Sequence, residues 1–117
     1  MTALGGALQG FRILDLTNVL FGPFGTQTLG DWGAEVIKVE SLAGDTWRSS
    51  GQFRNRGMSG QFMAANRNKR SVALDLKTAE GKAVLRRLIP TVDALVITGG
   101  RRGPQTESTG RVAQRRH

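Results

Sequence analysis

The sequence predicts an α/β domain with a mostly parallel sheet and flanking helices. Runs rich in branched apolar residues, which are typical of strands, alternate with segments of about ten residues that carry helix signals. One such segment joins the first two runs and another joins the last two. A strand–helix–strand unit is normally a parallel, right-handed crossover. The four predicted strands cover residues 11–17, 34–40, 71–76 and 92–97.

The first strand–helix–strand unit begins with the alternating run FRILDLT, Phe11–Thr17. A Gly-Pro pair follows at 22–23, and proline suits the first turn of a helix. We expect a short helix from about Phe24 to Trp32, with Gly33 as its stop signal. The run AEVIKVE, Ala34–Glu40, then forms the second strand.

The second unit is preceded by a long polar loop over residues 41–60, and loops of this length are usually functional or mobile. The run FMAAN, Phe62–Asn66, suits a single helical turn. SVALDL, Ser71–Leu76, is the third strand. Thr78 is the expected N-cap of a helix that carries an apolar stripe and ends near Pro90, before the fourth strand.

Composition excludes several classes of site. The chain has 117 residues, which is enough for one domain or a piece of one. It contains no cysteine, so there is no disulfide framework and no thiolate metal site. The single histidine is the last residue, His117, which argues against a histidine metal site or a Ser-His-Asp triad. No apolar run of about 18 residues and no secretory signal is present, so we expect a cytoplasmic protein without a membrane span.

The positive charge is unevenly distributed. Residues 1–97 hold 12 Lys and Arg against 8 Asp and Glu, and residues 98–117 hold 5 Arg against one Glu, so each part contributes +4 to the net charge of +8. The segment 98–117 is rich in Gly, Arg, Ser and Thr, and we expect a disordered basic tail. Such a tail can bind nucleic acid through phosphates, but the absence of interleaved aromatics makes this the less favoured function.

The carboxyl ends of the predicted strands indicate an anion site. Parallel sheets bind ligands beyond these ends, where backbone N–H groups, helix N-termini and Lys77 would converge. Such a rim suits a phosphate group. The basic cluster Arg67, Lys69 and Arg70 lies just before the third strand. We interpret it as flanking this rim, where a phosphate-bearing cofactor would bind. The alternative for Asn68, Lys69 and Arg70 is a structural role in closing the loop.

Three ordered stretches carry a family resemblance. GFRILDLTNVLFGPFGTQTLGDWGAEVIKVES, NRNKRSVALDLKTAEGKAVLRRL and VDALV, together covering residues 9–97, closely resemble the N-terminal part of the class III CoA-transferases. That family includes formyl-CoA transferase, carnitine CoA-transferase and α-methylacyl-CoA racemase. The resemblance implies an incomplete, Rossmann-like fold: this chain would be the N-terminal part of a larger domain, followed by the tail 98–117.

The resemblance also implies chemistry and partners. The transferases of the family bind acyl-CoA and move CoA to a small carboxylic acid through anhydride and thioester intermediates on an aspartate. The racemases instead move a proton next to the thioester carbonyl. Full-length members are interlocked homodimers, and no metal is implied. The choice between transfer and racemisation, the acyl group and the acceptor acid stay open.

Two stretches match the family's CoA-binding segments. In the loop after the first strand, Leu20 and Phe21 stand at CoA-contact positions. Oxalate-metabolising members tend to carry glutamine at the position of Leu20, so this leucine argues against oxalate as the substrate. A buried loop leucine is the alternative for Leu20.

The second stretch is LDLK, which matches the segment that lies along the CoA nucleotide. It supplies Leu74, Asp75, Leu76 and Lys77. We expect Lys77 to contact a phosphate or the ribose, since a lysine is a mobile point charge that tolerates imperfect geometry. The alternative is a solvated lysine before the helix. Asp75 is expected to position the turn and not to act as a base.

The chain also departs from the family. Many members carry a phosphate-binding arginine after the glutamate of the second strand, whereas Ser41 follows Glu40 here, and Arg48 or Arg54 are candidate substitutes. The family's catalytic aspartate lies beyond the turn after the fourth strand, and that turn is replaced near Ile97. None of the chain's own aspartates matches its motif; they are Asp15, Asp31, Asp45, Asp75 and Asp93.

We therefore expect no catalytic residue in this chain and little activity from it alone, with the tail 98–117 read out of frame or truncated. A second hypothesis is a non-catalytic nucleotide-binding or interaction module whose basic tail binds nucleic acid. A third is a defunct product. Salt dependence separates the first two, because phosphate-driven binding by a basic tail weakens steeply with salt.

Overall fold

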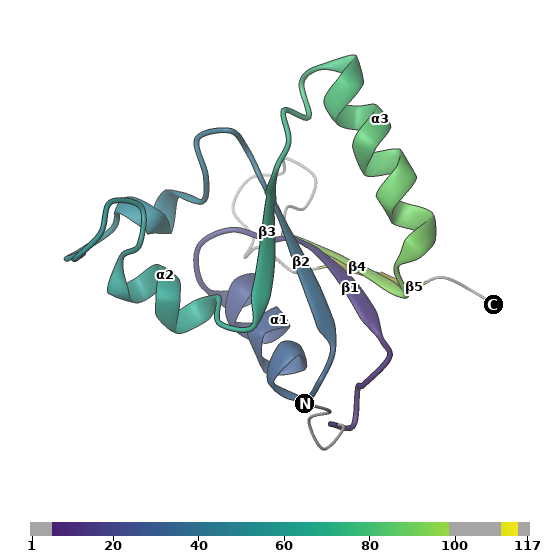
Figure 1. The fold of residues 1–117 in the computed structure, drawn as a ribbon, viewed down its shortest axis with the longest axis horizontal. Coiled ribbons are helices and arrows are strands. Elements are labelled where there is room, and N and C mark those ends of the chain that lie inside the picture. Colours follow the sequence, from purple (N-terminus) through teal and green to yellow (C-terminus); the bar gives the residue numbers. More distant parts are fainter. Residues whose placement is uncertain (1–5, 99–110, 115–117) are drawn as a thin grey trace, which may run out of the picture.

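The computed structural model describes residues 6–98 and the backbone of Arg111–Gln114. Five strands form one sheet in the order β3-β2-β1-β4-β5 (Figure 1). Strands β1 to β4 run parallel, and β5 pairs antiparallel with β4, which confirms the predicted α/β fold with a mostly parallel sheet. The strands are β1 (Arg12–Leu16), β2 (Glu35–Glu40), β3 (Lys69–Ala73), β4 (Ala94–Ile97) and β5 (Arg111–Gln114).

Within residues 6–98, three α-helices and two short 3-10 segments lie between the strands. They are α1 (Phe21–Asp31), η1 (Thr46–Ser49), α2 (Gly60–Ala65), α3 (Ala79–Leu88) and η2 (Ile89–Thr91). Two of the predicted signals act as expected: Gly33 has φ +103°, and the hydroxyl of Thr78 accepts a hydrogen bond from the Gly81 amide. Among the described residues, no helix is long and apolar enough to cross a bilayer.

Three predicted boundaries differ from the structure. Helix α1 begins at Phe21, before the Gly-Pro pair. Helix α2 begins two residues earlier than the predicted 62–66, because Ser59 caps it through its side chain, and it ends at Ala65. Strand β3 covers 69–73 and not 71–76. Its register with β2 pairs Val36 with Lys69 and Glu40 with Ala73, so β3 ends where β2 ends.

The predicted disordered tail, 98–117, falls largely outside the described residues. Of this segment the structure describes Thr98 and the backbone of β5. The backbone of β5 pairs with β4 from Ala94–Gln114 to Ile97–Arg111. Without β5, β4 would be an edge strand with unpaired N–H and C=O groups.

The sheet is covered on both faces. Helices α1 and α2 lie on one face, and α3 lies on the other (Figure 1). On the α3 face Leu14 and Val39 are buried in an apolar cluster with Leu85 and Leu88 of α3. The α1 face has a smaller apolar cluster at the amino end of the strands, built on Ile13 and Val36 and joined by Leu29 of α1, among others. Because side chains alternate along a strand, consecutive residues of β1 and β2 serve opposite faces.

Candidate functional site

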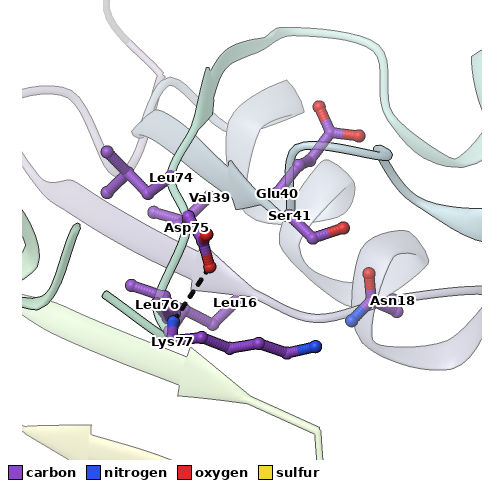
Figure 2. A pocket seen from close by; sticks show the side chains of 9 residues that line it. All are labelled: Leu16, Asn18, Val39, Glu40, Ser41, Leu74, Asp75, Leu76 and Lys77. Atoms are coloured by element: carbon purple, nitrogen blue, oxygen red, sulfur yellow. Dashed lines mark hydrogen bonds between the residues drawn. The ribbon is translucent and has the colours of Figure 1, made fainter.

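A pocket of about 240 Å³ lies at the carboxyl ends of β1, β2 and β3, on the side of the sheet covered by α3 (Figure 2). This is the edge where open parallel sheets bind ligands. Ligand pockets usually measure roughly 300–1,000 Å³, so this pocket suits part of a larger ligand. Its walls are apolar and its rim is polar. The lining residues are Leu16, Asn18, Val39, Glu40, Ser41, Leu74, Asp75, Leu76 and Lys77.

The LDLK segment forms one wall of this pocket, so the structure brings all four of its predicted site residues together. Leu74 is buried and Leu76 packs against the same apolar cluster. A carboxylate oxygen of Asp75 accepts a hydrogen bond of 3.0 Å from the Lys77 amide. The Asp75 carbonyl accepts hydrogen bonds from the amide of Thr78, at 3.1 Å, and from its hydroxyl, at 2.8 Å. Asp75 thus holds the turn that carries Lys77.

Gly81 is needed for this turn, and the sequence reasoning missed it. A Cβ at this position would lie 1.9 Å from the Asp75 carbonyl oxygen. Real Cβ atoms do not approach a backbone oxygen so closely, so any side chain here would displace the turn or the helix. A glycine in the first turn of an otherwise ordinary amphipathic helix is the only sequence signal for this contact, and it is a weak one.

Lys77 is exposed, and its side chain extends along the pocket toward the side where Asn18 lies (Figure 2). The Glu40 carboxylate, by contrast, is turned away from Lys77 in the same view. Within residues 6–98, the ion pairs of the structure do not include Lys77. Its ammonium group is therefore available to an anionic ligand.

The other two predicted contacts, Leu20 and Phe21, are not part of this lining. Leu20 directly precedes α1 and is 37% exposed, so the alternative of a buried loop leucine is wrong. Phe21 is the first residue of α1 and is 81% exposed. Asn18, two residues before Leu20, is the member of this loop that lines the pocket.

Five lining residues were not predicted: Leu16, Asn18, Val39, Glu40 and Ser41. All five stand at or just after the carboxyl end of β1 or β2, so the general rule for parallel sheets already contained the signal. What sequence alone does not give is which of the residues at these ends turn toward the α3 side.

Neither proposed substitute for the missing arginine reaches the pocket. Arg48 forms two 2.7 Å contacts with the carboxylate of Glu40, and its guanidinium stacks 3.9 Å from the centre of the Phe62 ring. The pKa of Arg48 is raised by these hydrogen bonds to Glu40. Arg54 lines a separate hollow with Phe53 and Met63. Among the described residues that line the pocket, Lys77 is thus the one basic side chain.

The basic cluster before the predicted third strand lies elsewhere, which corrects its interpretation as a rim of the cofactor site. Arg67 and Asn68 both contact the carboxylate of Asp31, and Arg70 approaches Glu35 at 3.7 Å. These residues stand at the amino end of β3, whereas the pocket lies beyond its carboxyl end. The structural alternative describes them better: they close the loop between α2 and β3.

A buried ionic network occupies the sheet face under α1 and α2. Lys69, with 2% of its side chain exposed, lies 2.9 Å from Asp15 and donates to the Pro23 carbonyl. Lys38 lies 3.0 Å from Asp45. Glu40 and Arg48 form the third pair, so three acids balance three bases. Among the described residues, no group of three acidic or histidine side chains is placed to hold a metal ion.

The pKa values of two ionisable groups in this network are shifted, each for a different reason. Desolvation lowers the pKa of the Lys69 ammonium to about 8, and the charge of Asp15 only partly offsets this. Desolvation alone would raise the pKa of Glu40, but hydrogen bonds from Arg48, Ser71 and the Asp45 amide outweigh it and bring the pKa to about 2. The Lys69 ammonium and the Glu40 carboxylate are therefore both ionised at neutral pH.

Comparison with known proteins places this geometry in a family. The sequence model of CoA-transferase family III matches residues 8–108. The chain is 49% identical over 90 residues to succinyl-CoA:glutarate CoA-transferase of Mus musculus, which covers 76% of this chain and 21% of that protein. It is 50% identical over 91 residues to formyl-CoA:oxalate CoA-transferase of Rhodopseudomonas palustris (strain BisA53), covering 77% and 21%.

Solved structures agree with this assignment. A CAIB/BAIF family protein from Brucella suis superposes with a TM-score of 0.75 at 39% identity, over 80% of this chain and 26% of that one. A hypothetical protein from Mycobacterium tuberculosis gives a TM-score of 0.67 at 42% identity, over 75% and 23%. The chain thus spans about a fifth to a quarter of the length of the relatives it matches. It belongs to CoA-transferase family III.

Proposed function

We propose that this chain supplies part of the acyl-CoA site of a CoA-transferase, with the nucleotide end of CoA against Leu74, Asp75, Leu76 and Lys77. One observation carries the proposal: this segment lines a half-apolar pocket at the carboxyl edge of the parallel sheet, together with Asn18 and Ser41. Apolar walls suit the flat faces of a base or the pantetheine chain. A polar rim with one cation suits phosphate or ribose.

The reaction proposed for the whole protein is transfer of CoA from an acyl-CoA to a small carboxylic acid. The names of three relatives support this class, since they pair succinyl-CoA or formyl-CoA with glutarate, mesaconate or oxalate. The acyl group and the acceptor of this protein are not specified by the residues of the pocket. We expect the reaction to take place in the cytoplasm. We expect the full-length chains that catalyse it to pair as homodimers.

The proposal places the nucleophilic carboxylate outside this chain. A covalent carboxylate must be free to attack the acyl group. Each aspartate of this chain already accepts a hydrogen bond or forms an ion pair within the chain. This supports the proposal that none of them is the nucleophile. Asp15 and Asp45 are buried beside lysines, Asp31 pairs with Arg67, Asp75 accepts from the Lys77 amide, and Asp93 accepts from the Arg12 amide.

Calorimetric titration of the full chain with CoA tests the site. We expect Lys77→Ala to weaken CoA binding about tenfold, because one charge-assisted phosphate contact is worth roughly 1.5 kcal/mol. Lys82→Ala is the matched control, since Lys82 is an exposed lysine of α3, the helix that Lys77 precedes, and it is not among the described residues that line the pocket. Equal affinity for the Lys77 and Lys82 variants would refute the site.

A second titration separates this site from a nucleic-acid-binding tail. Deleting residues 99–117 keeps Thr98, whose hydroxyl accepts a hydrogen bond from the Asn18 amide. This deletion should leave CoA binding within about twofold of the full chain, because the described lining lies within residues 16–77. Binding of single-stranded DNA should vanish on the same deletion if the tail is responsible, and should fall steeply with salt. Loss of CoA binding with the tail would contradict the pocket assignment.

A further inference from the structure

The loop after β1 contains a strained residue held by a buried carboxylate. Val19 has φ +71°, in the left-handed region that a β-branched residue rarely adopts. Its amide lies 3.3 Å from both carboxylate oxygens of Asp45, which belongs to the loop after β2 and is 2% exposed. Such a conformation persists only where the surroundings impose it.

The same carboxylate is paired with a buried lysine, which binds the loop at the residue before Asn18. The Lys38 ammonium lies 3.0 Å from Asp45 and donates a 2.9 Å hydrogen bond to the Thr17 carbonyl. The Thr17 carbonyl and the Val19 amide flank Asn18. The lysine–aspartate pair therefore holds the backbone on both sides of this one residue.

The pair itself is fixed in place. Lys38 belongs to the central part of the sheet, between β1 and β3, and its side chain is 1% exposed. The amide of Asp45 donates to Glu40 at 2.9 Å, and its carboxylate accepts from the Trp47 amide at 3.0 Å as the cap of η1. The loop after β1 is thus positioned by two anchored charges on the face opposite the pocket.

Asn18 is what this arrangement presents to the pocket. It lines the pocket on the side toward which the Lys77 side chain extends (Figure 2). A ligand that fills the pocket would lie between these two polar groups. Neither Lys38 nor Asp45 lines the pocket, so they act on a ligand only through the loop.

We propose that Lys38 and Asp45 are positioning residues that hold the loop after β1 in its strained conformation and so present Asn18 to the bound ligand. The identity of that ligand as CoA rests on the proposed function, but the positioning of Asn18 does not. A pair that served only stability would leave the loop conformation and the ligand affinity of the folded protein unchanged when it is weakened.

The test uses the full chain with Asp45→Asn, which keeps the shape of the side chain and removes the charge that faces Lys38. We expect CoA affinity to fall about tenfold, and the amide resonances of Asn18 and Val19 to shift and exchange faster with solvent. Val36→Ala is the matched control. Val36 is 1% exposed and lies on the same strand and face as Lys38, so this variant loses stability without touching the loop.

The two variants decide between positioning and stability. If Val36→Ala weakens CoA binding and alters the Asn18 and Val19 amides as much as Asp45→Asn does, the proposal is wrong. If wild-type protein does not bind CoA, the proposed function fails, and the amide signals alone decide the positioning claim. Should Asp45→Asn not fold, Val19→Gly takes its place. Relief of imposed strain should raise its urea midpoint, and a lowered midpoint would overturn the proposal.

Discussion

The two faces of this sheet are built from neighbouring residues with opposite chemistry. Val39 points into the apolar cluster under α3, whereas Lys38 and Glu40, on either side of it, belong to the ionic network under α1 and α2. The apolar face provides the walls of the pocket. The ionic face provides the contacts that fix the loops after β1 and β2. A one-residue slip of β2 would exchange these roles, so the network also specifies the register of the strand.

The comparison indicates that the ionic face serves geometry more than net stability. Removing two charges from water costs several kcal/mol per ion, and a well-packed apolar pair would often be as stable. What the apolar pair would lack is direction. The Asp45 carboxylate and the Lys38 ammonium select particular backbone groups, and apolar contacts select none.

The largest expected effect comes from breaking one buried pair. Lys69→Met keeps the length of the side chain but leaves the Asp15 carboxylate, fully buried, without its cation. We expect a loss of about 3–5 kcal/mol in the free energy of unfolding, measured by urea titration. Lys82→Met on the exposed side of α3 should cost less than about 0.5 kcal/mol. Similar costs for the two would mean that the Lys69 pair is not formed.

A cavity on the apolar face should cost nearly as much but behave differently with pH. Leu14 is fully buried against α3, and Leu14→Ala should remove about 3 kcal/mol. Since no charge is involved, the loss should be the same at pH 5 and pH 8. Urea titrations at both pH values measure this, and a loss that varies with pH would erase the proposed distinction between the faces.

Acid should weaken the ionic face through Glu40. Its pKa in the folded protein is about 2, against an ordinary value of 4.5, so the unfolded chain takes up a proton first as the pH falls. The stabilisation is complete above about pH 4.5 and is lost as the pH drops toward 2. Glu40→Gln should be less stable at pH 7 and should lose less stability than wild type below pH 4.5. Parallel curves for the two proteins would contradict the lowered pKa.

The smallest effect is expected at the exposed ion pair between Arg67 and Asp31. The Arg67 side chain is 63% exposed, so solvent screens the pair despite its 2.7 Å contact. Arg67→Ala should lower the free energy of unfolding, measured by urea titration, by less than any of the changes above, and by less still at high salt. A loss as large as that of Lys69→Met would show that exposure to solvent does not weaken an ion pair in this protein.

The sequence predicted the structure well where a feature depends only on residues that are close together in the chain. Apolar runs and helix caps predicted four parallel strands and the start of α3, since period and capping act within a few residues. Strand β3 was misplaced because Lys69 and Arg70 look like loop residues. Lys69 is buried only because Asp15, 54 positions earlier, meets it in the fold. No local pattern contains that pairing.

The residues of the site also divide into those that a sequence motif predicts and those whose roles depend on the assembled fold. The wall formed by Leu74–Lys77 followed from a family motif. Ser41 was not predicted, although it stands directly after a strand end, where parallel sheets bind ligands. The roles of Val19, Asp45 and Gly81 depend on a backbone dihedral angle, a contact between two loops and a close approach between helix and turn. Sequence reasoning has no access to these, because each arises only when separate elements are assembled.

The most direct test of the account is a map of amide chemical-shift changes in the full chain on addition of CoA. We predict changes at Asn18, at Ser41 and along Leu74–Lys77, with the amino-end cluster around Arg67 and Arg70 unaffected. Changes centred instead on the hollow beside Phe53 and Met63 would contradict the central claim that CoA binds at the carboxyl edge of the sheet under α3. The absence of any change at saturating CoA would contradict it equally.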